Sequence, residues 1–379
     1  MQMQPNRECA PARIPAADRG AAGFLRSAAA FGQTLAAHPD RHCPTALRIA
    51  ALSIGLATFG CTMGIAPRSI LTPGSPGADQ NAGSPIALPP EDTATPSATS
   101  TPGPSPTPTS LGGGGAGIVY HSGPPGEEEI VWLSTAGGSP IDLSNSRGSD
   151  ITPRFSPDGS RIAFASDRDG DLDIYLMNPD GSGVVNLTQN EALDDAPAWS
   201  PDGEFLVFSS DREGNREIYR MRSDGSGVLR LTADLGFDIT PVYSPDGATI
   251  AFASNREASD MELYLMSSEG GEERRLTDVE GRDEYPSWSP DGSAIVFASN
   301  RTGDFEIFRI QLAGGIARNL TTNRAADGSP AYSADGTLVA FASNRLGSYE
   351  IFTLDLATLE VTRLTANSTF DGDPSWAPR

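Results

Sequence analysis

The amino-acid sequence predicts an all-β fold for the C-terminal two thirds of the chain, and three observations lead to that prediction. A unit that begins with an aromatic residue, serine and a Pro-Asp-Gly turn, or a close variant, occurs five times. Its serines recur at intervals of 44 or 45 residues: Ser156, Ser200, Ser244, Ser289 and Ser333. Each unit holds short apolar runs separated by turn residues, and no segment shows sustained helical periodicity. Four short strands at this period are typical of one blade of a β-propeller.

The strands of a unit can be taken in order. The first is short and ends at the serine, as in PAWS, and the Pro-Asp-Gly turn follows it. The second is an almost unbroken apolar run such as IAFAS, which is expected where a sheet is buried on both faces. The third reads DIYLM or EIFRI and ends at a second turn such as NPDGSG. The fourth reads VVNLT, VLRLT or RNLT, so each unit is predicted to form one four-stranded blade.

The two ends of this region supply a further blade. GIVYHS (117–122), EIVWLS (129–134) and PIDLS (140–144) match strands two to four of a unit that lacks its first strand. The last six residues, PSWAPR, match a first strand and lie one period after the fifth unit. We therefore predict a six-bladed β-propeller, closed by a C-terminal strand that completes the first blade. Closure removes two open blade faces and places Trp376 between the first and last complete blades.

The segments WSPDG, IAFAS, SNRxG, EIF and LT recur in this order and resemble the repeat of TolB-type propellers, a WD40-like family also written PD40. The resemblance covers residues 117–379 and implies the six-bladed fold. It implies less about function, because blades of this type occur in proteins of many functions. In that family a small mixed domain precedes the propeller, and here a low-complexity segment stands in its place. Related propellers also precede hydrolase domains, but the sequence contains no G-x-S-x-G motif.

The first 116 residues are predicted to contain a targeting segment and a linker. Residues 1–48 lack a sustained apolar period and are expected to be a disordered extension. Residues 49–61 follow a basic flank and form a short, mostly apolar run, which is typical of an export signal or membrane anchor. Cys61 is a lipidation candidate because Gly60-Cys61 resembles the end of a bacterial lipoprotein signal. An uncleaved anchor, plain export and chance resemblance in a cytosolic protein are the alternatives. Residues 62–116 are rich in Pro, Ser, Thr and Gly and are expected to be a disordered linker.

Charge and composition exclude several kinds of partner and site. The residues after 116 carry 20 arginines, no lysine and 43 acidic residues, and this negative charge repels nucleic acid and anionic lipid. Contact with a membrane is therefore expected only through the N-terminal anchor. All three cysteines precede residue 62, which excludes a disulfide or a thiolate metal site in the propeller. His121 is the only histidine there, which argues against a histidine zinc site and a Ser-His-Asp triad.

Two sets of charged residues recur with the blades. An aspartate stands three residues before the proline of every first strand: Asp150, Asp194, Asp238, Asp283, Asp327 and Asp371. If first strands line the central channel, the loops that carry these aspartates open at one mouth. The loop between the second and third strands opens on the same face and carries an arginine in five blades: Arg168, Arg212, Arg256, Arg301 and Arg345.

Two interpretations of these residues remain open. Each aspartate either caps its own turn or pairs with a nearby arginine, which locks adjacent loops together. Alternatively, the six carboxylates form a ring at the channel mouth that takes up a hard cation such as Ca²⁺ or a cationic peptide. Five further acids precede the third strands and are expected to pair with the loop arginines: Asp173, Glu217, Glu262, Glu306 and Glu350.

Together these features predict a non-enzymatic, monomeric propeller that is exported, anchored at the cell envelope and binds a protein or peptide partner, with no cofactor required. An enzyme acting on a sugar, lactone or peptide in the channel is an alternative, but it needs a base or metal set that departs from the repeat. His121 is the one candidate of that kind. Glycan binding without chemistry is a further alternative.

Overall fold

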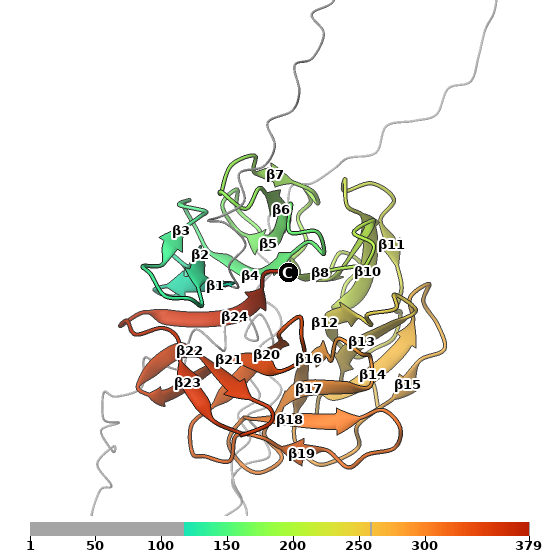
Figure 1. The fold of residues 1–379 in the computed structure, drawn as a ribbon. Coiled ribbons are helices and arrows are strands. Elements are labelled where there is room, and N and C mark those ends of the chain that lie inside the picture. The colour runs from blue at the N-terminus through green and yellow to red at the C-terminus, as the bar shows by residue number, and fades with distance from the viewer. Residues whose placement is uncertain (1–116, 258–259, 379) are drawn as a thin grey trace, which may run out of the picture. The chain divides into compact units, whose positions relative to one another are not determined.

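The computed structural model describes residues 117–257 and 260–378, and this part of the chain is all-β. Its 24 strands form six four-stranded antiparallel sheets, which stand as blades around a common centre (Figure 1). The described residues contain no helix that is long and apolar enough to cross a membrane. The prediction of a six-bladed β-propeller is confirmed. The predictions for residues 1–116, including those for the export signal, Cys61 and the linker, lie outside the described residues.

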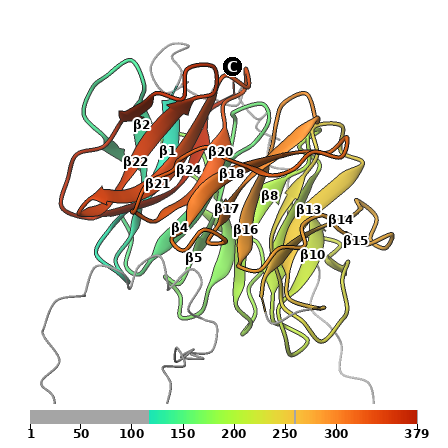
Figure 2. The ribbon, with the colours of Figure 1, turned by 90° about the horizontal axis from the view of Figure 1, so that it is seen from below.

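Five blades are built from consecutive strands. Blade 2 contains β4 (Asp150–Phe155), β5 (Ile162–Ser166), β6 (Asp173–Met177) and β7 (Val185–Asn186). Blade 3 contains β8 (Asp194–Trp199), β9 (Phe205–Ser210), β10 (Glu217–Arg222) and β11 (Leu229–Arg230). Blade 4 contains β12 (Asp238–Tyr243), β13 (Thr249–Ser254), β14 (Glu262–Ser267) and β15 (Arg274–Arg275). Blade 5 contains β16 (Asp283–Trp288), β17 (Ala294–Ser299), β18 (Glu306–Gln311) and β19 (Arg318–Asn319). Blade 6 contains β20 (Asp327–Tyr332), β21 (Leu338–Leu346), β22 (Ser348–Asp355) and β23 (Val361–Arg363). The side view shows these sheets standing next to one another with their strands running between the two faces of the ring (Figure 2).

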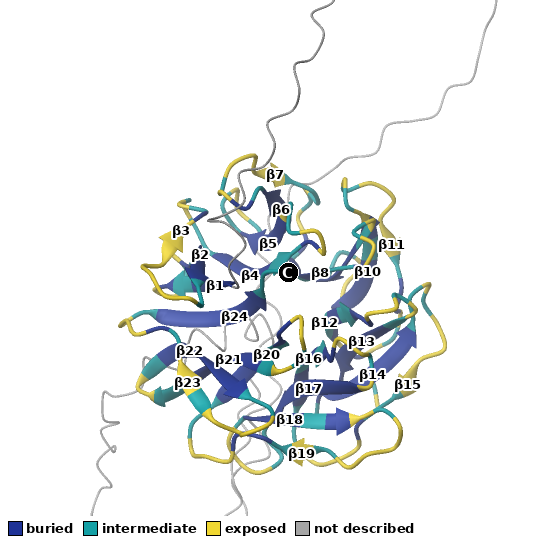
Figure 3. Ribbon diagram, viewed as in Figure 1, coloured by how far each residue is buried: buried dark blue, intermediate teal, exposed yellow. Residues whose placement is uncertain are grey.

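The hydrophobic core lies between neighbouring blades. The second and third strands are buried along nearly their whole length, whereas the short fourth strands on the outside are largely exposed (Figure 3). Between blades 2 and 3, Ala163 and Ala165 of β5 belong to the same buried cluster as Phe208 of β9 and Tyr219 of β10. Each middle strand therefore buries both faces, which explains its unbroken apolar sequence.

The remaining blade, called here the split blade, joins the two ends of the described chain. It contains β24 (Phe370–Trp376), β1 (Gly117–Gly123), β2 (Glu129–Ser134) and β3 (Ile141–Asp142). β24 pairs antiparallel with β1, with Trp376 opposite Ile118 and Asp371 opposite Ser122. The prediction that a C-terminal strand completes this blade and closes the ring is confirmed.

Trp376 holds the closing strand against blade 6. Its indole Nε1 donates a hydrogen bond to the backbone oxygen of Ala331 in β20, at 3.0 Å. The indole also packs on a buried cluster that includes Tyr349 and Ile351 of β22. On the other side of the strand, Ala377 packs against the cluster shared with blade 2. The strand thus lies between the first and last complete blades as predicted, and the indole itself packs toward the last.

A bulge in every first strand shapes the inner wall of the ring. The residue before the proline has a left-handed backbone, with φ between 47° and 55°, in all six blades: Thr152, Ala196, Thr240, Tyr285, Ser329 and Asp373. The pairing register shifts at this point, between Ile151 and Arg154 in blade 2. Left-handed backbone is unfavourable for residues other than glycine, and a residue before proline normally prefers an extended conformation. These six positions, which we call the bulge residues, were not predicted from the sequence.

Candidate functional site

The six recurring aspartates lie at the start of the first strands and are completely buried. Five of them accept a hydrogen bond from the loop arginine of their own blade. In blade 3, Nη2 of Arg212 lies 3.0 and 2.9 Å from the two carboxylate oxygens of Asp194. The equivalent pairs are Asp150–Arg168, Asp238–Arg256, Asp283–Arg301 and Asp327–Arg345. The structure therefore brings the two recurring sets together as ion pairs between a buried carboxylate and a partly buried guanidinium, one within each complete blade.

Residues of the repeat hold each loop arginine in place. In blade 3, Nε of Arg212 donates to Oγ of Ser210 at 2.8 Å. The guanidinium also lies over two rings, 5.2 Å from the centroid of Phe208 and 4.8 Å from that of Tyr219. The other four loop arginines lie over the equivalent rings. The serine and the aromatic residues of the IAFAS and EIF segments thus position the guanidinium for the aspartate.

The split blade lacks a loop arginine, since Pro124 stands at that position, two residues after Ser122. Asp371 instead accepts hydrogen bonds from Oγ of Ser122 at 2.6 Å and from Nδ2 of Asn367 at 3.1 and 2.9 Å. Burial raises the pKa of Asp371, and the bonds from Ser122 and Asn367 oppose that rise. Neutral donors thus take the place of the guanidinium in this blade.

The prediction that the acids before the third strands pair with the loop arginines is wrong. In blade 3, Glu217 accepts hydrogen bonds from Oγ1 of Thr232 and Nη2 of Arg230, both at 2.7 Å. Thr232 Oγ1 also accepts the bond of the Ile218 N–H, so it joins the third strand to the end of the fourth. The same threonine bond recurs at Asp173, Glu262, Glu306 and Glu350. The loop arginines are unavailable to these acids because they point inward, to the first strand.

One group of three acids among the described residues could offer oxygen atoms within 4.8 Å of one another: Glu217, Asp234 and Asp238. Oxygen ligands of this kind suit Ca²⁺. However, Nη2 of Arg256 lies 2.9 Å from Asp234 and 2.6 Å from Asp238, and Arg230 binds Glu217. The guanidinium groups contact the carboxylates that a cation would need and add positive charge beside them. The residues present therefore do not fit a calcium site in this arrangement.

Asp234 departs from the repeat at a position whose side chain contacts the recurring aspartate in other blades. Asn190, Asn323 and Asn367 stand four residues before their aspartates and donate an amide hydrogen bond to them. Asp234 stands at the same place before Asp238 and offers a second carboxylate instead. Burial raises the pKa of Asp238 to about 7, and the charge of Asp234 adds to the rise.

We expect Asp234→Asn to stabilise the protein, and to do so more as the pH rises. A carboxyl group with a raised folded-state pKa adds stability below its unfolded pKa of about 3.9, and loses that stability as the pH rises through the folded value. For Asp238 the loss therefore falls between the unfolded pKa and about 7. An asparagine removes the like charge and supplies a donor. Arg256 loses its contact with Asp234 but keeps those with Asp238 and Glu273, so the net gain should reach about 1 kcal/mol above neutral pH.

Urea unfolding at several pH values measures this gain. Asp278→Asn is the matched control, because Asp278 also contacts an arginine but its side chain is 85% exposed. A gain that is equal at pH 5 and pH 8 would contradict the coupling between the two carboxylates.

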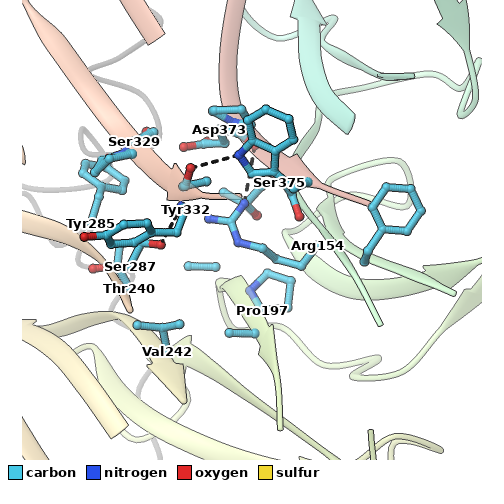
Figure 4. A pocket seen from close by; sticks show the side chains of 18 of the residues that line it. Arg154, Pro197, Thr240, Val242, Tyr285, Ser287, Ser329, Tyr332, Asp373 and Ser375 are labelled. Carbon is cyan, nitrogen blue, oxygen red and sulfur yellow. Dashed lines mark hydrogen bonds between the residues drawn. The ribbon is translucent and has the colours of Figure 1, made fainter. Parts of the chain in front are cut away.

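A cavity of about 340 Å³ lies at the centre of the ring (Figure 4). Its wall runs from the bulge residues to the turns after the first strands, with contributions from five complete blades and the split blade. Prolines that follow the bulge residues form much of that wall, together with Tyr332 and Trp376. None of the six recurring aspartates belongs to the lining. They lie at the beginning of the first strands, whereas this cavity, which we call the channel cavity, lies toward their ends.

The channel cavity is where the six blades differ from one another. The bulge residue is tyrosine in blade 5 and aspartate in the split blade, at Tyr285 and Asp373. Two residues after the bulge residue, blade 2 has Arg154 where other blades have alanine, valine or serine. These residues were not predicted from the sequence. The available signal was variation inside an otherwise regular repeat, at the positions on either side of the proline.

Three charged residues line the channel cavity, and two of them have an ionisable partner. Asp195 lies 2.5 Å from Nη1 of Arg216, and both side chains are buried. Burial raises the pKa of Asp195, and Arg216 opposes the rise. Oδ2 of Asp373 lies 3.4 Å from Nδ1 of His121.

Arg154 differs from these two carboxylates. Its Nη1 donates to the backbone oxygens of Pro153 at 2.9 Å and Asp373 at 3.4 Å. No side-chain carboxylate in the described ranges 117–257 and 260–378 forms an ion pair with it. Burial lowers the pKa of Arg154, and the charge of Asp373 opposes the shift. Figure 4 shows the Arg154 side chain extending across the cavity toward Tyr285.

His121, the histidine that departs from the repeat, does not line the channel cavity. It is buried in β1 and stacks on Phe370 with 5.3 Å between ring centroids. Its contacts are thus with the closing strand, through Phe370 and Asp373.

Comparison with protein families places this fold. The family model described as the TolB beta propeller domain matches residues 105–236 and 231–379, more than half of the chain. The chain belongs to the TolB beta propeller domain family. No curated protein matches this sequence.

Solved structures agree with membership of the TolB propeller family. TolB from Acinetobacter baumannii is 26% identical, with a TM-score of 0.64 over 70% of this chain and 67% of that chain. A putative TolB from Agrobacterium tumefaciens is 24% identical, with a TM-score of 0.55 over 68% of this chain and 90% of that chain. Hydrazine synthase from Kuenenia stuttgartiensis is 15% identical, with a TM-score of 0.60 over 69% of this chain and 46% of that chain. The last two likenesses show the fold alone.

Proposed function

We propose that this protein is a non-enzymatic TolB-type propeller that receives a segment of a protein partner in the channel cavity. The observation that supports this most is the position of the side chains that break the repeat. Arg154, Tyr285 and Asp373 come from three different blades and line the same cavity. Structural residues such as the Asp–Arg pairs recur in each complete blade, whereas a binding site for an asymmetric ligand needs different side chains in different blades.

The lining of the cavity suits a peptide. Prolines and aromatic side chains supply apolar surface, and Arg154 and Thr152 of β4 and Thr240 of β12 supply polar groups. Cavities of roughly 300–1,000 Å³ bind small ligands, and this one is at the lower end of that range, so it admits a short segment rather than a folded domain.

The recurring aspartates and arginines have a separate role in this proposal. Each pair ties the entry of a first strand to the loop between the second and third strands. They thereby hold the loops of the face opposite the channel cavity in fixed positions, and they bind neither cation nor peptide.

In this proposal the protein is a monomer that is exported and anchored at the cell envelope. Residues 49–61 direct export, Cys61 carries a lipid or the run stays as an uncleaved anchor, and residues 62–116 space the propeller from the membrane.

Cys61→Ser is expected to move the protein from the membrane fraction to the soluble exported fraction. Unchanged membrane association would favour the uncleaved anchor, and an intact N-terminus recovered from the cytosol would overturn both forms.

Site-specific photocrosslinking in producing cells tests the binding role. A benzoylphenylalanine at position 331 lies in the cavity wall, at the position equivalent to Arg154, where a large side chain fits. The matched control is position 357, which is exposed in the turn between β22 and β23. We expect a defined protein adduct from position 331 and none from position 357.

The partner identified in this way provides the affinity test. Ala331→Trp fills the cavity and should weaken binding at least tenfold, whereas Ala357→Trp should leave it unchanged. Binding that tolerates the tryptophan at position 331 would remove the channel cavity as the partner site.

A further inference from the structure

We infer that the group held in the channel cavity is a carboxylate, presented by the C-terminal end of an extended peptide and bound by Arg154. This inference rests on the proposed function and names the chemistry of its ligand. It concerns a site far along the first strands from the recurring Asp–Arg pairs, and those pairs take no part in it.

Arg154 has no ion-pair partner in the described part of the chain, and only the more distant charge of Asp373 acts on it. A guanidinium has five N–H donors, arranged in a fork that matches a carboxylate. The Arg154 guanidinium makes hydrogen bonds to two backbone oxygens, both through Nη1. Neither its Nη2 nor its Nε has a hydrogen-bond partner in the described part of the chain. A ligand carboxylate would neutralise the charge of this side chain and accept hydrogen bonds from its remaining donors.

The charged residues that line the cavity favour an anion over a cation as its ligand. Its two acidic residues already have a partner each: Asp195 faces the guanidinium of Arg216, and Asp373 faces the imidazole of His121, which is charged only when protonated. The one lining charge without an ion-pair partner among the described residues is thus positive. A cationic ligand would have to compete with the partners of both acids and approach Arg154 as well, so it is disfavoured.

Two threonine hydroxyl groups of the residues that line the cavity lack a hydrogen-bond partner within the described ranges. Oγ1 of Thr152 and Oγ1 of Thr240 are buried, and neither has a hydrogen-bond partner in the residues that the structure describes. Both residues are bulge residues that line the cavity. Buried hydroxyls without a partner are unfavourable, and a ligand with several oxygen atoms would satisfy them.

The size and surroundings of the cavity favour a chain end. First strands from all six blades enclose it, and its volume of about 340 Å³ is small. A segment from the middle of a chain would have to enter and return through the same space. A chain end enters once and carries a carboxylate at its tip, and the proline-rich wall then packs against the residues before it.

Calorimetric titration of the intact protein with short peptides tests the inference. The probes are Ac-Ala-Pro-Ala with a free C-terminal carboxylate, the same peptide as its C-terminal amide, Ac-Ala-Glu-Ala-amide and glucuronate. We expect the free acid to bind at least about tenfold more tightly than its amide, as a charged hydrogen-bonded pair implies. A side-chain preference would appear as tight binding of the glutamate peptide, and a sugar site as tight binding of glucuronate. Either result would overturn the assignment of a peptide chain end.

Variants of Arg154 test the residue itself. Arg154→Gln should abolish the preference for the acid, and Arg154→Lys should keep part of it because the charge remains while the fork is lost. Arg161→Gln is the control, since Arg161 donates to Asn178 outside the cavity. Melting temperatures show whether the variants fold, and the acid–amide comparison on the unmodified protein does not depend on any variant. Equal affinity for acid and amide would overturn the carboxylate inference.

The two proposals can fail separately. If acid and amide bind equally but Ala331→Trp abolishes partner binding, the channel cavity is the partner site and the ligand group is wrong. If the acid is preferred through Arg154 but Ala331→Trp leaves partner binding intact, the carboxylate site exists and the proposed function of the cavity is wrong.

Discussion

Deleting residues 370–379 is expected to abolish cooperative folding of the propeller. The deletion removes β24 and with it the pairing to β1, which is the contact that closes the ring. It leaves the apolar faces of the split blade and blade 6 open to water, and it removes the hydrogen bond from Trp376 to Ala331. Loss of the Trp376 side chain alone should cost about 3 kcal/mol, the lower end for a tryptophan truncation because the indole is only partly buried. Loss of the strand should use up most of a typical domain stability of roughly 5–15 kcal/mol.

Trp199→Ala distinguishes the effect of losing a packed indole from the effect of opening the ring. Trp199 occupies the equivalent position in blade 3, and its Nε1 donates to the backbone oxygen of Arg154 at 3.1 Å. Its truncation and that of Trp376 should lower the free energy of unfolding by similar amounts, whereas only the deletion should abolish the unfolding transition. Urea titration followed by circular dichroism measures all three. A deletion variant that unfolds cooperatively near the midpoint of the full chain would show that the split blade does not close the ring.

Arg212→Ala is expected to destabilise the protein by about 3–5 kcal/mol, because it leaves a buried carboxylate without its cation. Asp194 has no exposed surface, and after the substitution only the amide of Asn190 would remain as a side-chain donor to it. The substitution also removes the stacking of the guanidinium on Phe208 and Tyr219.

A second substitution identifies the buried charge as the cause. Adding Asp194→Asn to Arg212→Ala should recover part of the lost stability, since the neutral amide costs less to bury than the carboxylate. Arg274→Ala is the control, because Arg274 is exposed at the outer strand and should change stability by less than about 0.5 kcal/mol. If the double variant were no more stable than Arg212→Ala, the loss would come from packing and not from charge.

The blade count, the strand order and the closing strand could all be predicted from the sequence. They depend on local signals that repeat along the chain, namely the Pro-Asp-Gly turns, the IAFAS runs and their spacing. The segments that begin at Gly117 form a blade without its first strand, and the segment around Trp376 is a first strand without a blade. Their pairing could therefore be predicted from the sequence. The recurrence of the aspartates and arginines was visible in the same way.

Only the tertiary structure decided which acid each arginine contacts. Arg212 lies a few residues from Glu217 in sequence, yet it reaches Asp194 across the sheet while Glu217 binds Thr232. Side chains on neighbouring strands meet according to sheet pairing and pleat, which sequence distance does not encode. The channel cavity depends even more on the tertiary structure. Its wall takes short segments from six first strands, each about one repeat apart in the chain, and a left-handed residue before each proline shapes it. Local rules disfavour that conformation, so the position of Arg154 in the cavity follows from the closed ring and not from the residues around it.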